Sequence, residues 1–341
     1  MTNDNNLDYS MYWDGSTMFG YNAFLNMIDG PRGTGKSFRV KKFAIDNYIR
    51  TGGKFLYIRR YKKEMKKALF KGPNPVFFKG LVNKIPKYKK MNLTNNYDSF
   101  LMGKENPETI GYTSILSTAT VEKSGEFDDV NLVIFDEYLI VGGLYHYLKN
   151  EITDCFLELV ESVIRTRNGK IILLGNSSTV FNPYRMYFNI PEGKHIYYDK
   201  ERNIYYEHII NEKFAHYKET TPVGRLIKGT AYGNYNINND FLGDNTNFIQ
   251  QKPRDSKFIF TIKINNMILG IWKLNKYMYV TTEYNPNFPI MFAFSKDDHD
   301  ENTILEKRKT SSLIKVICEK YNRGCLFFEN QIIKKSFEEL L

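Results

Sequence analysis

Cysteine is scarce in this sequence, and long apolar runs are absent from it. Among 341 residues the only cysteines are Cys155, Cys318 and Cys325, and no two of them form a CxxC pair. Three cysteines, an odd number without close spacing, argue against a disulfide framework or a zinc site and are typical of a protein in a reducing compartment. Apolar stretches such as 171–174 are far too short to cross a bilayer. The polar first eight residues lack a secretory pattern, so we expect no membrane partner and no export.

Positive charge is concentrated in one segment. The chain carries 48 Lys and Arg against 38 Asp and Glu, a formal net charge of +10. Residues 59–90 hold twelve of these cations and one acid, a local net charge of +11, so the rest of the chain sums to −1. A localised excess favours contact with a polyanion, and a solvated lysine-rich loop is the alternative.

Strands and helices alternate through the first 205 residues. Apolar strands are expected at 22–28, 54–59, 112–116, 132–135 and 171–174, and amphipathic helices at 37–50 and 151–167. This alternation predicts an α/β domain with a mostly parallel sheet over residues 1–205. The basic stretch 60–106, with its several prolines, is expected to be irregular.

The composition changes after residue 205. Residues 206–250 are rich in Gly and Asn and predict a linker subdomain. Three strands at 257–264, 267–274 and 277–282 follow, joined by turns that contain asparagine, which tolerates the positive φ of tight hairpins. We therefore expect a separate C-terminal domain over residues 251–341.

The segment 30–37 matches the Walker A pattern GxxxxGK[ST] in full, between an expected strand and an expected helix. Backbone N–H groups of such a loop wrap phosphates, and the helix directs its positive end at them. Lys36 would reach the β- and γ-phosphates, and the Ser37 hydroxyl would ligate Mg²⁺. The predicted nucleotide-binding residues of this loop are Gly30, Pro31, Arg32, Gly33, Thr34, Gly35, Lys36 and Ser37.

An acidic pair of the Walker B type follows the apolar run 132–135. Asp136 and Glu137 stand where a buried parallel strand would end, which is where ligands bind in open α/β sheets. Asp136 would hold Mg²⁺ through its water shell, and Glu137 would act as general base on the attacking water. The neighbouring glutamate favours ATP hydrolysis, and the nearest string to a guanine signature, 83–86, lacks its aspartate.

Several polar residues have two interpretations. Asn176 lies just after an expected strand. In one interpretation it positions the attacking water or senses the γ-phosphate, and in the other it is an ordinary turn residue. Arg165 and Arg167 end the expected helix 151–167, where they either favour the helix dipole or supply an arginine finger to a neighbouring subunit. Arg32, inside the phosphate loop, is a rival finger acting in cis.

A mixture of cations and aromatic residues begins directly after the second expected strand. Lys and Arg neutralise backbone phosphate without reading bases, which gives salt-sensitive and sequence-tolerant binding. The residues predicted to bind DNA in this way are Arg59, Arg60, Lys62 and Lys63.

Further motifs run in order over nearly the whole chain. They are Gly30–Ser37, Tyr57–Lys62, Val133–Glu137, Arg165–Arg167, Gly175–Asn176, Asn182–Tyr184, Phe241–Asp244 and Asp255–Phe258. The nucleotide motifs identify only an ATPase, but the collinear set resembles the DNA-packaging ATPases of phi29-type short-tailed bacteriophages.

The resemblance implies a ring motor, pentameric in these phages, that uses ATP and Mg²⁺ to drive double-stranded DNA through the portal of an empty prohead. It implies an ATPase domain of the additional-strand (ASCE) class, a small linker and a C-terminal α+β domain of RNase H-like fold. The location would be the host cytoplasm, with transient attachment to the prohead. In phi29 a packaging RNA scaffolds the motor, so such an RNA is a candidate partner here, although no feature of the sequence itself indicates one.

The resemblance also implies residue roles. Lys36 would take part in catalysis, Arg165 would be the finger acting in trans, Lys123 a second trans-acting cation, and Lys62 a residue that grips DNA. Larger terminase relatives cut DNA with paired carboxylates, which two-metal hydrolysis requires. The first strand expected in the C-terminal domain, 258–263, has no acid, so we predict a nuclease-inactive domain.

Two other functions compete with a packaging motor. One is a P-loop helicase or another DNA-stimulated ATPase of viral replication, which would unwind a forked substrate without a prohead. The other is a nucleotide-bound structural or DNA-anchoring protein, in which Glu137 would have no catalytic role.

Overall fold

A computed structural model describes residues 11–68, 76–95, 98–118, 127, 129–140, 147–148, 150–176, 182–191, 194–230, 248–288, 290–307 and 310–340. The chain divides into two compact units. The first comprises Met1–Ser178 and Glu192–Leu242, and the second comprises Thr179–Pro191 and Gly243–Leu341. In the parts described, no helix combines the length and the apolar character needed to span a bilayer.

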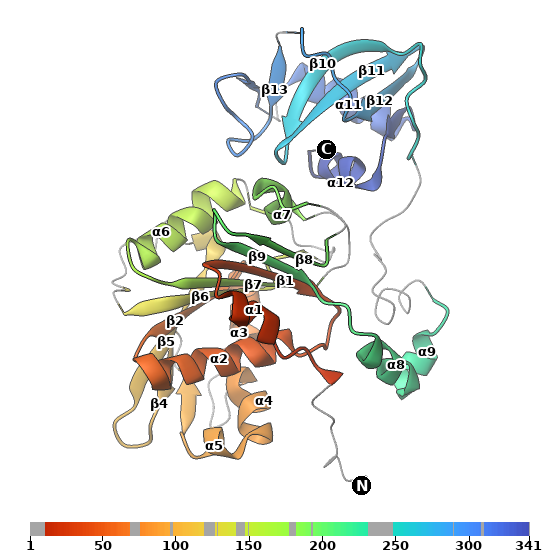
Figure 1. Cartoon of the computed structure of the whole chain (residues 1–341). Coiled ribbons are helices and arrows are strands. Elements are labelled where there is room, and N and C mark those ends of the chain that lie inside the picture. Colours follow the sequence, from red (N-terminus) through yellow and green to blue (C-terminus); the bar gives the residue numbers. More distant parts are fainter. Residues whose placement is uncertain are drawn as a thin grey trace. The chain divides into compact units, whose positions relative to one another are not determined.

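The described strands of the first unit form one nine-stranded sheet in the order β3-β4-β5-β2-β6-β7-β1-β9-β8 (Figure 1). Its parallel strands are β5 (Glu108–Ile115), β2 (Lys54–Arg59), β6 (Val130–Asp136), β7 (Lys170–Asn176), β1 (Leu25–Gly30) and β9 (Ile204–His208). The antiparallel strands are β4 (Ser99–Met102) and β3 (Leu93–Asn95) at one edge and β8 (Ile196–Asp199) at the other. The expected mostly parallel α/β sheet is confirmed.

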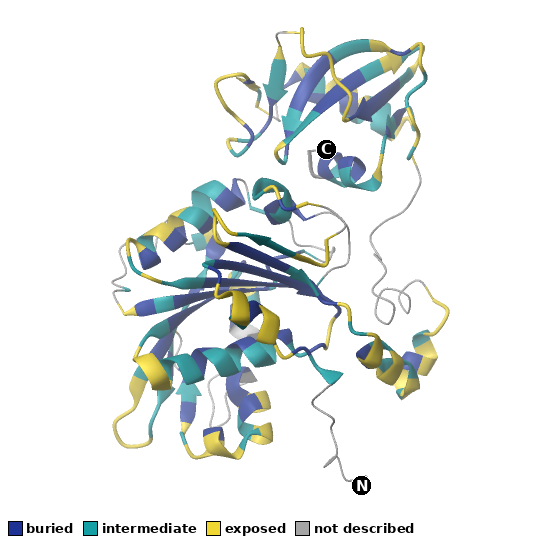
Figure 2. Ribbon diagram, in the orientation of Figure 1, coloured by how far each residue is buried: buried dark blue, intermediate teal, exposed yellow. Residues whose placement is uncertain are grey.

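The position of β7 defines the class of the sheet. β7 lies between β1, which leads into the phosphate loop, and β6, which ends in the acidic pair. A strand inserted at this place, together with a glutamate directly after the aspartate that ends β6, is the arrangement expected for an ASCE ATPase. β1 is buried along its whole length, and Figure 2 shows the neighbouring central strands mostly buried as well, as in parallel sheets covered on both faces.

Helices cover both faces of this sheet (Figure 1). On one face lie α2 (Lys36–Thr51) and α4 (Val76–Lys84), whose apolar side chains share a core cluster with β1, β2, β6 and β7. The other face carries a π-helical turn, η3 (Glu151–Leu157), that continues into α6 (Glu158–Ile164). The short α1 (Ser16–Tyr21) precedes β1.

The basic stretch 60–106 is more regular than expected. It contains α3 (Lys62–Ala68), α4, α5 (Pro86–Lys89), β3 and β4. Phe77, Phe78 and Leu81 of α4 are buried in the core, although the helix ends in a lysine. The prolines and lysines of this stretch obscure the helical pattern in the sequence. The helix forms because packing of three apolar side chains into the core outweighs the weak local helix propensity.

The predicted boundary at residue 205 falls within β9. The helices α8 (Glu212–Thr220) and α9 (Pro222–Ile227) follow β9 and are grouped with the first compact unit. The motif at 241–244 and residues 231–247 lie outside the described residues.

The described strands of the second unit form a six-stranded sheet in the order β14-β13-β10-β11-β12-β15. β11 is antiparallel to both of its neighbours, and the other pairings are parallel, which is the expected RNase H-like arrangement. The strands are β10 (Lys257–Ile264), β11 (Met267–Leu274), β12 (Tyr277–Thr281), β13 (Met291–Ala293), β14 (Ile304–Leu305) and β15 (Leu326–Phe328). The helices are α7 (Pro183–Tyr187), α11 (Ser312–Asn322) and α12 (Gln331–Leu340).

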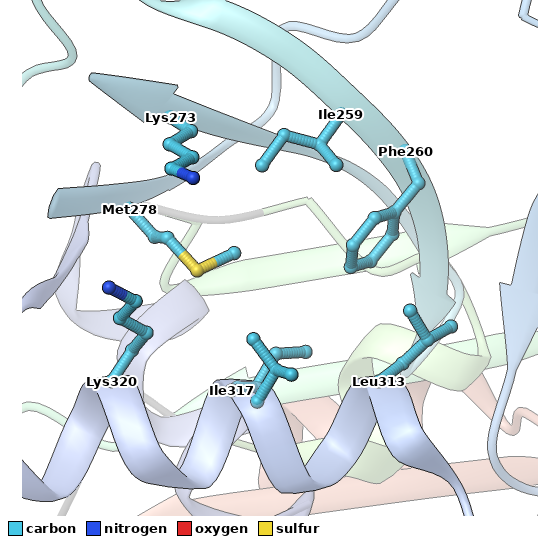
Figure 3. Close-up of a pocket in the computed structure, with 8 residues that line it drawn as sticks. Ile259, Phe260, Lys273, Met278, Leu313, Ile317 and Lys320 are labelled. Carbon is cyan, nitrogen blue, oxygen red and sulfur yellow. The ribbon is translucent and has the colours of Figure 1, made fainter. Parts of the chain in front are cut away.

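The hairpin turns of this unit form as predicted. Asn265, Asn266 and Asn275 all have positive φ, at 49°, 64° and 54°. A cavity of about 250 Å³ lies between the strands β10 to β12 and α11 (Figure 3). Its lining is mainly aliphatic and aromatic, with Lys273 and Lys320 on one side and no carboxylate.

Candidate active site

Three parallel strands of the first unit bring the predicted motifs together at one edge of the sheet. Gly30, where β1 enters the phosphate loop, is paired in register with Asn176 at the end of β7. Leu174 is paired with Ile28 of β1 on one side and with Asp136 of β6 on the other. The phosphate loop, the acidic pair and Asn176 therefore share the carboxyl edge, where open α/β sheets bind ligands.

The phosphate loop has the backbone that its glycines permit. Gly33 and Gly35 adopt φ of 91° and 92°, which side-chain-bearing residues rarely reach. Lys36 is buried, and its Nζ donates to the carbonyls of Gly30 at 2.9 Å and Pro31 at 2.8 Å, and to Asn176 Oδ1 at 3.4 Å. Burial lowers the pKa of this ammonium to about 8, although nearby carboxylates oppose the shift.

The oxygen atoms of the phosphate loop and of β6 form a set suited to Mg²⁺. Ser37 Oγ donates to Asp136 Oδ1 at 3.0 Å, so the two predicted ligands already lie side by side. Hydroxyl and carboxylate oxygens are the hard ligands that Mg²⁺ takes, and only one or two carboxylates are needed. The residues present therefore fit the ion.

Tyr57 of β2 completes this arrangement and was not predicted from the sequence. Its hydroxyl donates to Asp136 Oδ2 at 2.7 Å, within the buried interior. Burial, reinforced by the charge of Asp136, raises the pKa of Tyr57 well above its usual value, so the phenol stays a donor. The motif Tyr57–Lys62 includes this tyrosine but gives it no role, because it reaches the aspartate only through the pairing of β2 with β6.

Glu137 has a left-handed backbone and a cationic partner. Its φ is 60°, an uncommon value for a residue other than Gly, Asn or Asp. Arg59 Nη2 lies 2.9 Å from Glu137 Oε2, and Arg59 Nη1 donates to the carbonyl of Asp136 at 3.2 Å. Burial opposes the charged form of Arg59, but surrounding acidic groups raise its pKa, so the guanidinium stays charged. Arg59, expected to bind DNA, instead lies in the candidate ATP site.

Arg60 is also placed differently from the prediction. Its side chain is 2% exposed and pairs with the buried Glu151 through Nε–Oε2 and Nη2–Oε1 contacts of 2.8 Å. The same guanidinium donates to the backbone carbonyls of Glu137 and Tyr138. Because its guanidinium is buried and hydrogen-bonded within the protein, Arg60 is not a candidate for DNA binding.

The other predicted cations differ in exposure. Lys62 and Lys63 are exposed on the first turn of α3, and Arg165 is exposed directly after α6, with φ of 51°. Arg167 is half-buried, and its guanidinium donates to the carbonyls of Phe127 and Val163. Lys123 lies outside the described residues.

Two further segments flank the phosphate loop, and neither was predicted. A side chain at Gly33 would lie 3.2 Å from the ring of Phe214 on α8, and one at Gly35 would lie 3.4 Å from Tyr12. The rings of Tyr12 and Phe214 contact each other, with centroids 5.6 Å apart. Asn211 links the segments, because its Nδ2 donates to the Met11 carbonyl at 2.7 Å and its Oδ1 caps α8.

The fold and this site define the class of the protein. A phosphate loop with its lysine and serine, an aspartate that ends β6 with a glutamate directly after it, and an intervening β7 are the parts of an ASCE P-loop ATPase. The model of the family described as "Podovirus DNA encapsidation protein (Gp16)" matches residues 7–341. The chain therefore belongs to this family of phage DNA-packaging ATPases.

Individual relatives agree with this assignment. A DNA packaging protein of Bacillus phage B103 is 32% identical over 324 residues, which cover 93% of this chain and 96% of that protein. A chain of the bacteriophage phi29 viral genome packaging motor assembly is 29% identical, with a TM-score of 0.67 and coverage of 97% of this chain and 100% of that chain. The N-terminal domain of the phi29 DNA packaging ATPase is 28% identical, with a TM-score of 0.51 over 59% of this chain and 97% of that domain.

Proposed function

We propose that this protein is a Mg²⁺-dependent, ATP-driven translocase that moves double-stranded DNA into a prohead as a ring, pentameric as the family resemblance implies. It would work at the portal in the host cytoplasm, and a packaging RNA is a further candidate partner. The observation that carries the proposal is that Lys36, Ser37, Asp136 and Glu137 gather at the carboxyl edge of the sheet, where Ser37 donates to Asp136. The matched DNA packaging protein and the matched viral genome packaging motor support a role in packaging viral DNA.

In this mechanism Lys36 exchanges its contacts with the Gly30 and Pro31 carbonyls for phosphate oxygens when ATP binds. Ser37 and Asp136 would hold Mg²⁺, which neutralises charge on the β- and γ-phosphates. Tyr57 keeps Asp136 oriented. Glu137 then accepts a proton from the water that attacks the γ-phosphate.

Glu137 is not free to do this while Arg59 holds its carboxylate. Arg59 ends β2, and Lys62 begins α3 three residues later, exposed to solvent. We infer that contact between DNA phosphates and Lys62 or Lys63 shifts this short connection and releases Glu137. Hydrolysis would then depend on DNA, as a motor requires.

Arg165 is the better candidate for a finger acting in trans. It is exposed beyond the end of α6, where its Nε donates to the Ser162 carbonyl at 3.3 Å, whereas Arg167 is half-buried and its guanidinium donates to the carbonyls of Phe127 and Val163. In mixed assemblies a Lys36→Ala subunit still supplies Arg165, and an Arg165→Ala subunit still has its own Lys36 and Glu137. Mixing these two variants should therefore recover some ATP hydrolysis, and no recovery at any ratio would remove the assignment.

The second unit is proposed to bind DNA or a partner without cutting DNA. β10 carries no Asp or Glu, and two-metal hydrolysis needs paired carboxylates on such a sheet. Linear duplex incubated with the protein, Mg²⁺ and Mn²⁺ should stay intact.

The proposal is tested with Glu137→Gln in prohead packaging and ATP turnover assays. We expect turnover to fall by roughly a hundredfold or more, with ATP affinity retained and no DNA packaged. Glu161→Gln, which changes an exposed acid on α6, is the matched control and should behave as wild type. Full activity of Glu137→Gln would contradict the mechanism, and prohead-independent unwinding of forked DNA would favour a helicase.

A further inference from the structure

Tyr138, the residue after Glu137, is fully buried and held at three points. Its N–H donates to the Leu174 carbonyl of β7 at 3.1 Å, and its own carbonyl accepts from Arg60. Its hydroxyl donates to Asp29 Oδ1 at 2.5 Å. The proposed mechanism uses neither this tyrosine nor this aspartate.

Asp29 lies at the base of the phosphate loop. It is 2% exposed, directly precedes Gly30 and is paired in register with Gly175 of β7. A Cβ at Gly175 would lie 2.8 Å from Asp29 Oδ1, so the glycine leaves the space that the carboxylate occupies. The bond to Tyr138 therefore joins the end of β1 to the turn after β6, across β7.

This bond explains how the backbone of Glu137 is kept in place. A glutamate with φ of 60° persists only when its surroundings determine that conformation. On its N-terminal side Asp136 is fixed by Ser37 and Tyr57, at 3.0 and 2.7 Å. On its C-terminal side the anchor is Tyr138. The turn is thus held from both ends.

We propose that Asp29 and Tyr138 are positioning residues for ATP hydrolysis, which fix the turn carrying Glu137 relative to the phosphate loop. The inference rests on the proposed role of Glu137 as general base. Loss of the Tyr138 hydroxyl leaves a buried carboxylate with one donor fewer and frees one end of the turn. Because a displacement of about 1 Å at a reacting group can cost about a hundredfold in rate, turnover should fall while ATP binding persists.

The test compares Tyr138→Phe with Tyr88→Phe in the full chain. Tyr88 is also fully buried, and its hydroxyl donates to Asp46 Oδ1 at 2.7 Å, but the pair links α5 with α2 and touches no proposed catalytic group. We expect Tyr138→Phe to lower kcat by roughly tenfold or more, with the Kd of a non-hydrolysable ATP analogue changed by less than about threefold. Tyr88→Phe should change neither by more than about twofold. Equal kcat losses in the two variants, or a Tyr138→Phe loss confined to Kd, would overturn the proposal.

Asp29→Ala supplies the second arm of the test. If both residues act through their shared bond, the double variant Asp29→Ala/Tyr138→Phe has the kcat of the worse single variant, whereas multiplied losses would contradict the pairing. If Tyr138→Phe does not fold, Asp29→Ala is tested by itself. A fall in its kcat with little change in the Kd of the ATP analogue would support the proposal, and a loss confined to Kd would overturn it.

Glu137→Gln, measured alongside, separates the two hypotheses. Its full activity would refute the proposed function itself. An inactive Glu137→Gln beside a fully active Tyr138→Phe would refute only the positioning role.

Discussion

Two pairs of cations, Arg59–Arg60 and Lys62–Lys63, are separated by one residue in the sequence but occupy opposite environments. The arginines are enclosed, with side-chain exposures of 13% and 2%, and each is paired with a carboxylate. The lysines are exposed on the first turn of α3. The difference arises because Arg59 ends a central strand of the sheet, whereas Lys62 begins a surface helix.

The comparison shows that a run of positive charge in a sequence is not a single surface. Arg59 and Arg60 organise the loop around Glu137, and only the lysines that follow have the exposure that DNA contact requires. The segment thereby connects a candidate ATP site with a candidate DNA site over a few residues. Substitutions in this segment and in the phosphate loop should therefore affect either the enclosed ATP site or the exposed DNA-binding lysines, and not both.

Arg60→Ala should have the largest effect, and it should be on stability. It leaves Glu151 buried without its ion-pair partner, which costs about 3–5 kcal/mol in typical buried pairs. Lys63→Ala, at an exposed position, should change the free energy of unfolding by less than about 0.5 kcal/mol. Denaturant unfolding of both variants checks this, and equal stabilities would contradict the buried placement of Arg60.

The pH dependence of ATP binding should report the burial of Lys36. Burial lowers the pKa of Lys36 to about 8, so the ammonium is charged below that pH and loses its charge as the pH rises above it. The affinity for an ATP analogue should be flat below pH 8 and fall by up to about tenfold per pH unit above it. At about pH 9.5 a lysine with this pKa is mostly neutral. An affinity for the analogue that stays constant up to that pH would contradict the role of a charged Lys36 in binding ATP.

Arg59→Ala should change regulation more than stability. Removing the partner of Glu137 should raise hydrolysis without DNA by several-fold and reduce the further stimulation by duplex DNA. Arg59→Lys, which keeps a cation at this place, is the matched control and should preserve more of the stimulation. An unchanged ratio of rates with and without DNA would disconnect Arg59 from coupling.

Lys62→Ala should have the smallest effect, confined to DNA. Loss of one phosphate contact should weaken binding similarly for unrelated duplexes and lower the salt slope by about one. ATP affinity should stay at its wild-type value. Binding isotherms at several salt concentrations measure both quantities, and a loss selective for one DNA sequence would contradict a phosphate contact.

The sequence predicts the parts of this molecule that depend on local pattern. The strands that lead to Asp136 and Asn176 and the asparagine turns of the second sheet carry short signals that the structure confirms. Gly33 and Gly35 of the phosphate loop adopt the positive φ that their pattern favours. The ASCE class and the RNase H-like fold came from the family resemblance.

Features that depend on long-range pairing escaped prediction. Tyr57 reaches Asp136 only because β2 lies beside β6, and Arg60 meets Glu151 across 91 residues. The same holds for Asp29 with Tyr138 and for Phe214 above Gly33. No periodicity encodes such contacts, since they arise from the order of strands in the finished sheet.

The most direct measurement is steady-state ATP hydrolysis per subunit against protein concentration, with and without linear double-stranded DNA and proheads. If neighbouring subunits complete shared sites and DNA releases Glu137, the rate per subunit rises with concentration and increases further with duplex DNA. A slow rate that stays indifferent to concentration, to DNA and to added proheads would contradict the account of a DNA-driven ring ATPase.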